Sequence, residues 1–229
     1  MAITMTADEV AASYKEVMGH ELGGIFHELR NQTISLYWNW SEYVELFGST
    51  PERVDILNKA AGSFFFIVQN ALWRDYLLHI CRLTDAAKTT GKANLSIRCL
   101  PDLVDLEKAP RTKELVQIAV DRSEFARDWR NRRLSHYDLQ VALGRAAEPL
   151  APASREHVRE AITALGELVN YLNLQYRGST TIFDLPESGG SAKSLLYVLR
   201  EGIEAECARR NRIRSGVATN DDFIPRGAV

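Results

Sequence analysis

Apolar residues recur at helical spacing along almost the whole chain, and this pattern constrains the fold more than any other feature. The clearest example runs from Val158 through Ile162, Leu165 and Val169 to Leu172, which places these side chains on one face of a helix. No long window shows the strict alternation of apolar and polar residues that is typical of a half-buried strand. The sequence therefore predicts an all-α protein, an antiparallel bundle of five or six helices.

Recognisable start and stop signals bound the expected helices. Thr6 and Glu9 have the spacing of a capping box, Ser154 is an N-cap and Gly178 a C-terminal stop. Gly23 and Gly24 are expected to bend or split the first long helix. The expected helices cover residues 8–47, a segment from 52 that merges with 58–87, and residues 112–136, 154–178 and 192–212. The segment 58–87 is apolar on nearly every side, so it is expected to be the central, most buried helix.

The chain length fits one large domain. The 229 residues can bury a core without disulfides or metals. We expect residues 1–213 to form a single helical-bundle domain, with its core at about 11–176 and an extra C-terminal helix at about 192–212. Residues 214–229 are mostly polar and are expected to form a disordered tail.

Composition excludes several classes of protein. The formal net charge of −2 argues against a generally basic nucleic-acid binder, so any nucleic-acid contact must be local. Cys81, Cys99 and Cys207 are widely separated and form no C-x-x-C pair, which argues against a disulfide framework or a zinc site. No signal peptide or membrane span is recognisable. We therefore expect a cytoplasmic protein without metal, cofactor or membrane contact.

The segment 127–136 concentrates positive charge. On a regular helix Arg127, Arg130, Arg133 and His136 form one slanting row, with Arg132 beside it. Clustered guanidinium groups repel one another and favour anions, and each can form a bidentate pair of hydrogen bonds with phosphate oxygens. A histidine at the end of this row suits a general base. A solvated charged face that ends in a dipole-compensating histidine is the structural alternative.

A second polar group lies within the most apolar helix. Asp75, His79 and Arg82 fall on one stripe of that helix, and Asp85 follows at its end. This placement favours a buried, mutually satisfied polar network over a substrate site. The alternative is that Arg82 or Asp85 supports the functional site from behind.

The arginine-rich segment carries a resemblance to a known superfamily. Arg130 and Asn131, followed by four residues and His136 late in the third long helix, resemble the Arg-polar-x4-His motif of HEPN domains. The stretch WRNRRLSHYD at 129–138, with RLTD at 82–85 upstream, is most similar to the abortive-infection AbiU branch. The resemblance covers about residues 11–176.

This resemblance implies a function and a set of roles. HEPN families include metal-independent endoribonucleases and RNA-binding relatives in phage defence, abortive infection and toxin–antitoxin pairs. It implies a homodimer that acts on RNA and leaves 2′,3′-cyclic phosphate ends. His136 would be the general base or acid, Arg130 would bind the scissile phosphate, and Asn131 would orient substrate or His136. The motif itself does not require Arg133; the geometry of the arginine row, rather than the resemblance, leads us to expect that Arg127, Arg132 and Arg133 contact phosphates.

Two further readings of the resemblance stay open. One is a non-catalytic RNA-binding or protein-interaction module that keeps the bundle and the basic row. The other is a toxin-like component silenced by a separate antitoxin, such as a nucleotidyltransferase.

Overall fold

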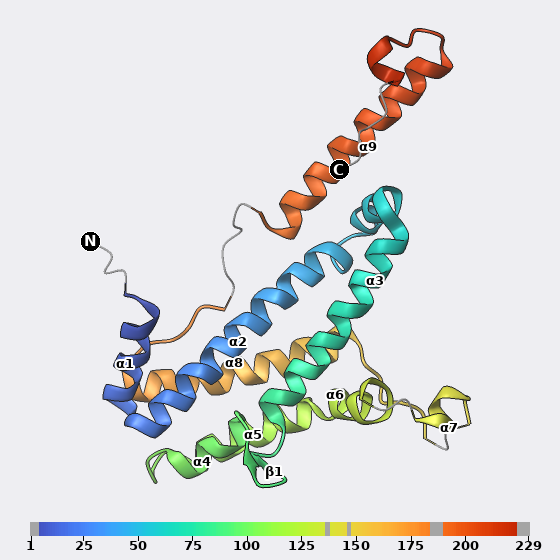
Figure 1. Cartoon of the computed structure of the whole chain (residues 1–229). Coiled ribbons are helices and arrows are strands. Elements are labelled where there is room, and N and C mark those ends of the chain that lie inside the picture. Colours follow the sequence, from blue (N-terminus) through green and yellow to red (C-terminus); the bar gives the residue numbers. More distant parts are fainter. Residues whose placement is uncertain (1–4, 136–137, 146–147, 184–189, 224–229) are drawn as a thin grey trace. The chain divides into compact units, whose positions relative to one another are not determined.

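The structure is a computed structural model, and it describes residues 5–135, 138–145, 148–183 and 190–223. The described elements are helices, apart from one two-stranded antiparallel hairpin (Figure 1). The predicted all-α class is confirmed. The chain divides into two compact units, which we call unit 1 (Met1–Trp40 and Leu72–Leu185) and unit 2 (Ser41–Ala71 and Pro186–Val229).

Unit 1 contains most of the helices. It takes α2 as far as Trp40 and α3 from Leu72 onward. Its elements in chain order are α1 (Ala7–Met18), α2 (His20–Phe47), α3 (Pro51–Thr84), β1 (Lys88–Thr89), β2 (Lys92–Ala93), the 3-10 helix η1 (Ile97–Cys99), α4 (Leu100–Leu103), α5 (Ala109–Arg122), α6 (Glu124–Trp129), the π-helix η2 (Arg130–Leu134), α7 (Leu139–Ala142) and α8 (Arg155–Arg177).

Glycines fix the junction of α1 and α2, but not at the place that the sequence predicts. The break falls at Gly19, whose φ of 83° lies in the left-handed region, and α2 then runs without interruption past Gly23 and Gly24. Gly23 instead allows close packing, because a Cβ atom there would lie 2.4 Å from the carbonyl oxygen of Tyr14 in α1. Gly23 therefore serves helix contact, and neither glycine of the pair bends α2.

The core of unit 1 centres on α8. As predicted, Ser154 caps its start and Gly178 ends it in the left-handed conformation. The structure adds that His157 completes a capping box with Ser154. Its apolar stripe is buried, and α5 packs alongside it (Figure 1). The predicted core residues Val158, Ile162, Leu165, Val169 and Leu172 are each at most 2% exposed.

Unit 2 is built from the end of α2, the start of α3, α9 (Ala192–Arg214) and the 3-10 helix η3 (Asn220–Phe223). Helix α3 has a kink at Ala61, where the backbone leaves helical geometry. The packed apolar residues of unit 2 come from α2, α3 and α9: Leu46, Leu57, Phe65, Ala192 and Leu196.

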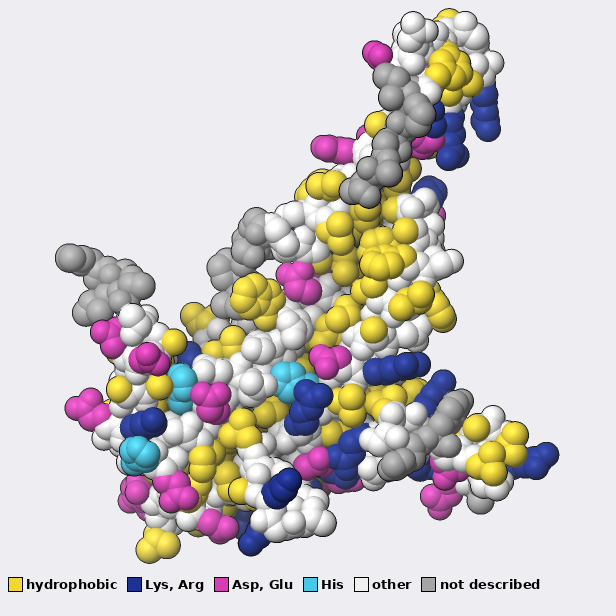
Figure 2. All heavy atoms as spheres, viewed as in Figure 1, with side chains coloured by type: hydrophobic (Ala, Val, Ile, Leu, Met, Phe, Trp, Pro, Cys, Tyr) yellow, Lys and Arg dark blue, Asp and Glu magenta, His cyan; other side chains and the backbone are white. Residues whose placement is uncertain are grey.

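The expectation that the whole segment 58–87 is buried is wrong for its first half. In unit 2, Phe64, Phe66 and Ile67 are 60%, 67% and 64% exposed. Figure 2 shows hydrophobic side chains at the surface of this part of α3. In unit 1, by contrast, Leu77 and Ile80 on the same helix are fully buried. Despite this apolar surface, no helix in the described ranges has both the length and the hydropathy needed to cross a bilayer.

Part of the expected disordered tail carries an ordered turn. Asp222, in η3, is only 3% exposed. Its carboxylate accepts hydrogen bonds from the Arg212 side chain, and Arg209 donates to its backbone oxygen. The Arg212 contact holds the pKa of Asp222 well below its usual range. The charge pairing with α9 explains the order, because the apolar pattern of this segment gives no sign of it.

The close approach of α1 and α2 makes a stability prediction. Replacing Gly23→Ala forces the two backbones apart, and we expect the free energy of unfolding to fall by roughly 1–3 kcal/mol, the range for overpacking. Gly24→Ala is the matched control, since its Cβ would meet only the end of the Lys15 side chain at 3.5 Å. That variant should be unchanged or more stable by up to about 1 kcal/mol. Urea unfolding of both variants measures the difference, and equal stabilities would contradict the packing.

Candidate functional site

The arginine-rich segment begins where a predicted continuous helix is broken. The sequence predicts one helix over 112–136, but the structure ends α5 at Arg122 and starts α6 at Glu124. Ser123 lies fully buried between them and donates a hydrogen bond from its hydroxyl to the Ala119 carbonyl oxygen at 2.6 Å. A serine that bonds back to its own helix favours such a bend. The break sets the direction of α6 separately from that of α5.

The segment then widens into a π-helical turn at Arg130–Leu134. The Ser135 N–H donates to the Arg130 carbonyl oxygen at 2.9 Å, five residues back. Single π-turns interrupt the three-to-four-residue spacing of an α-helix and are frequent at functional sites. The slanting row expected from α-helical spacing is therefore not maintained past Arg130, and the arginines point to different partners.

The Asp85 carboxylate joins two of these arginines. Arg130 donates from Nη1 to Asp85 Oδ2, and Arg127 Nε lies 3.6 Å from Asp85 Oδ1. All three side chains are partly buried, with 16–28% exposure. Asp85 comes directly after α3, so the contact fastens the end of α3 to the arginine segment. Sequence reasoning placed Asp85 near the site but did not identify this pairing.

Arg127 is engaged by the protein rather than free for phosphate, in contrast to our expectation. Its Nη2 donates to both the carbonyl and the hydroxyl oxygen of Thr84 at 3.2 Å, and its Nη1 donates to Glu124. With Nε beside Asp85, every nitrogen of the guanidinium has a protein partner. Its geometry suits holding α6 against the end of α3.

Arg132 is similarly occupied. It pairs with Asp128 at 3.3 Å and donates to the carbonyl oxygens of Glu148 and Pro149 at 2.6 and 3.2 Å. Asp128 in turn accepts from the Ala151 N–H at 2.8 Å. These contacts hold the segment before α8 against the π-turn Arg130–Leu134. Because Arg132 already donates to three protein oxygens, few of its N–H groups remain for an RNA phosphate.

Arg130 keeps one nitrogen available. Its Nε donates to the Asn131 side-chain oxygen at 3.0 Å, and its Nη1 is held by Asp85, but Nη2 makes no hydrogen bond or ion pair with a described residue. Asn131 thus orients Arg130 in the structure. Arg133 is exposed and lies over the Trp129 ring, with Cζ 5.2 Å from the ring centre. The arrangement presents one oriented guanidinium and a second, stacked one at the surface.

The predicted catalytic His136 falls outside the described residues. Ser135, which precedes it, is hydrogen-bonded to the carbonyl oxygen of Arg130. The structure therefore places the arginine half of the motif, and the role of His136 stays a prediction from the sequence.

The expected satisfied network of Asp75, His79 and Arg82 is not present. Asp75 and Arg82 are exposed, and neither bonds to His79. His79 is 8% exposed, and its Nε2 is buried without a hydrogen-bond partner among the described residues. Burial lowers the pKa of His79, while nearby Asp75 raises it and Arg82 lowers it. His79 is therefore neutral at neutral pH.

One cysteine close to the arginine pair was not considered as a site residue. Cys81 lies on α3 near Arg130 and Asp85 and is 1% exposed. Burial raises the pKa of its thiol to about 11, against the opposing effect of Arg130. The thiol stays protonated at neutral pH, and it is therefore a packing residue rather than a nucleophile.

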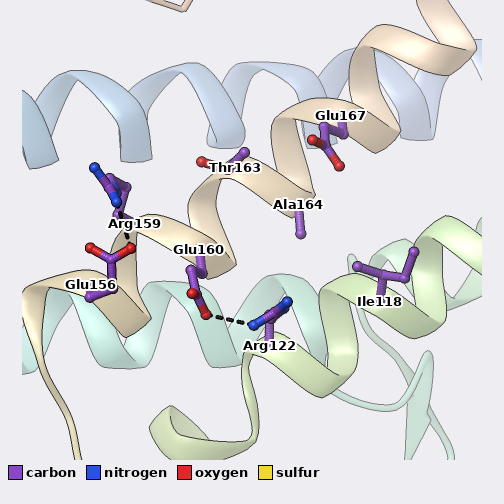
Figure 3. Close-up of a pocket in the computed structure, with 8 residues that line it drawn as sticks. All are labelled: Ile118, Arg122, Glu156, Arg159, Glu160, Thr163, Ala164 and Glu167. Atoms are coloured by element: carbon purple, nitrogen blue, oxygen red, sulfur yellow. Dashed lines mark hydrogen bonds and ion pairs between the residues drawn. The ribbon is translucent and has the colours of Figure 1, made fainter.

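A charged groove between α5 and α8 offers little chemistry. Figure 3 shows Arg122 of α5 and Glu160 of α8 pointing toward one another. Arg122 Nη1 lies 2.7 Å from Glu160 Oε2. Arg159 pairs with Glu156 on the same groove. These charges neutralise one another. Within the described ranges, no three His, Cys, Asp or Glu side chains converge as metal ligands would.

Comparison with known families now bears on the arginine turn. The family model for AbiU2, a HEPN family, matches residues 20–193. The chain belongs to the AbiU2 family. No curated protein and no solved structure matches it. The match confirms the resemblance drawn from the sequence, and it includes α2, α3 and the segment from α4 to α8.

Within this AbiU2 chain, the matched range holds both parts of the candidate site. Arg130 and Asn131 lie inside it, as does Asp85 at the end of α3. The last helix, α9, lies almost wholly outside the match. We accordingly define the candidate site as Asp85, Arg130 and Asn131, with Arg133 at its edge.

The buried His79 predicts a pH dependence of stability. Its folded pKa lies below its usual 6.5, so the unfolded chain binds this proton more readily. The contribution to stability is full above the unfolded pKa and is lost as the pH falls through 6.5 toward the folded value. We expect His79→Gln to show a shallower loss of unfolding free energy than the wild type, roughly between pH 7 and 5. Equal slopes in urea titrations would show that His79 does not titrate in this way.

Proposed function

We propose that this AbiU2 protein is a metal-independent endoribonuclease, and that Arg130 holds the scissile phosphate. One observation carries the proposal: a guanidinium fixed on two sides, by Asp85 and Asn131, presents its remaining nitrogen at the start of the HEPN motif. An arginine held in this way loses little further freedom when it binds an anion.

The proposed reaction is an internal transfer within RNA. His136 removes the proton from a ribose 2′-hydroxyl, and the 2′-oxygen attacks the adjacent phosphorus in line with the leaving 5′-oxygen. The new P–O2′ bond forms as the P–O5′ bond breaks, and the 5′-oxygen takes up a proton. The products are a 2′,3′-cyclic phosphate and a 5′-hydroxyl. Arg130 stabilises the charge that develops on the non-bridging oxygens.

Asp85 positions Arg130 in this scheme. A carboxylate beside a phosphate-binding guanidinium lowers the local positive potential, so it weakens RNA binding while it fixes geometry. That combination suits a group whose value lies in orientation. Catalytic rates respond steeply to misplacement of about 1 Å.

The assembly and setting follow from the family. The active form is a homodimer in which the motifs of two protomers share one RNA cleft. The biological role is abortive infection or a toxin–antitoxin pair, with a nucleotidyltransferase as a candidate antitoxin. These statements rest on family membership and the motif, and analytical ultracentrifugation tests the dimer directly.

Cleavage in EDTA tests the function. Wild-type protein should cut RNA without a divalent ion, and Arg130→Ala and His136→Ala should each reduce the rate about a hundredfold or more. Arg122→Ala is the matched control, because Arg122 is an exposed arginine paired with Glu160 away from the motif. It should leave the rate unchanged. Binding of RNA by the wild type without cleavage would instead support the non-catalytic RNA-binding module.

Substitution of Asp85 separates positioning from binding. Asp85→Asn removes the charge that orients Arg130, so we expect kcat to fall about tenfold or more. RNA affinity should be equal or higher, because a negative charge beside the phosphate is gone. Asp85→Glu should restore part of kcat. A parallel loss of kcat and affinity, with lower thermal stability, would indicate a merely structural role.

A further inference from the structure

Asp85, which contacts the arginine pair, also lines a cavity within unit 1. The cavity has a volume of about 530 Å³, and its walls come from α2, the end of α3 and the β1–β2 hairpin. Pockets for small ligands measure about 300–1,000 Å³, so the cavity is large enough for a nucleotide. Of the candidate-site residues, Asp85 lines the cavity, and Arg130, Asn131 and Arg133 do not.

Three polar side chains on this cavity have atoms without a hydrogen-bond partner among the described residues. The Nε2 atom of His79 is buried and unsatisfied, and His79 is nine-tenths buried. Gln32 from α2 and Arg82 from α3 also line the cavity, and neither makes a hydrogen bond or ion pair with a described residue. Buried polar atoms in folded proteins nearly always have partners, and an exception indicates that a ligand or water supplies one.

The rest of the lining combines apolar side chains with Thr89, Asn94 and the Asp85 carboxylate. Leu83 is buried and Leu95 is 40% exposed, and both border the cavity together with Ala93. Apolar side chains suit the faces of a nucleobase, while a carboxamide and a neutral imidazole suit its polar edge. The Arg82 guanidinium adds a charge for phosphate. This mixture is the chemistry that recognises a nucleotide.

Asp85 connects the cavity to the proposed phosphate site. It lines the cavity and also accepts the hydrogen bond from Arg130. A nucleotide in the cavity therefore lies next to the guanidinium that holds the scissile phosphate in the proposed function. We infer that the cavity binds one base of the RNA, on a nucleotide adjoining the cleaved bond, and so sets the base preference of cleavage. This inference rests on the proposed function and names the residues that give it specificity.

Binding of single nucleotides tests the cavity directly. The full chain is titrated with AMP, GMP, CMP and UMP in turn by calorimetry, and the histidine ring signals are followed by NMR. We expect at least one nucleotide to bind and to shift the His79 signals, which His79→Gln identifies. Gln32→Ala and Arg82→Gln should each weaken that binding about tenfold or more.

Arg74→Gln is the matched control for charge. Arg74 is an exposed arginine on the same helix, and it does not line the cavity. The Arg74→Gln variant should bind the nucleotide with the same affinity as the wild type. Failure of all four nucleotides to bind, or equal affinities in Gln32→Ala and the wild type, would overturn the inference. The test does not need His79→Gln to fold, because Gln32 and Arg82 are accessible side chains.

Mapping of cleavage sites separates this inference from the proposed function. If the endoribonuclease and the cavity are both real, Gln32→Ala cuts RNA with a broader choice of base at the cleaved bond. Cleavage by Gln32→Ala with an unchanged base preference would contradict the base-binding cavity but not the endoribonuclease activity. If the protein binds nucleotides but does not cleave RNA, the endoribonuclease proposal is wrong, and the cavity cannot set a cleavage preference. The nucleotide-binding site itself would still be supported.

Discussion

The contact of Asp85 with Arg130 and Arg127 connects the parts of the molecule on which the candidate site depends. Asp85 is itself held at its backbone, where its N–H donates to the Cys81 carbonyl at 2.8 Å and its carbonyl accepts from the Ser96 hydroxyl at 2.5 Å. Its carboxylate is thus a fixed point at the end of α3. A partly exposed ion pair contributes little to stability, but it is effective in setting the direction of a guanidinium.

The π-turn distributes charges that would otherwise conflict. Four arginines within seven residues on a regular helix face similar directions and repel one another. Here the helix break and the wide turn send them to different places: Arg127 to Thr84, Arg130 to Asp85, Arg132 to Asp128 and Arg133 to the Trp129 ring. Most of the positive charge is neutralised by the protein. The guanidinium groups presented at the surface, those of Arg130 and Arg133, point in specific directions. This agrees with a net charge near zero and a local rather than general nucleic-acid site.

Helical period and caps predict much of this fold, because both are local. The Thr6 and Ser154 caps and the buried face of α8 occur where the sequence indicates them. The departures come from contacts between distant residues. Gly23 is needed for the backbone of α1, and Asp222 is ordered by an arginine ten residues earlier. The motif singles out Arg130 from the sequence alone, and its role as a phosphate ligand stays a proposal, whereas its Asp85 partner, 45 residues upstream, could not be predicted from the motif.

The contrast between satisfied and unsatisfied groups suggests different tasks for the two features that Asp85 contacts, the arginine pair and the cavity. At the arginine pair, Arg127 is fully engaged and Arg130 keeps only one nitrogen, which suits a transition-state charge of fixed position. At the cavity, His79 Nε2 and the Gln32 side chain have no hydrogen-bond partner among the described residues. A site that must hydrogen-bond its ligand rejects a ligand that lacks the matching groups, because its own polar atoms then stay unpaired. In the proposed enzyme, the rate of cleavage therefore depends on Arg130, and the base preference depends on the cavity. Because the Asp85 carboxylate contacts both, a base bound correctly in the cavity helps to place the scissile phosphate correctly at Arg130.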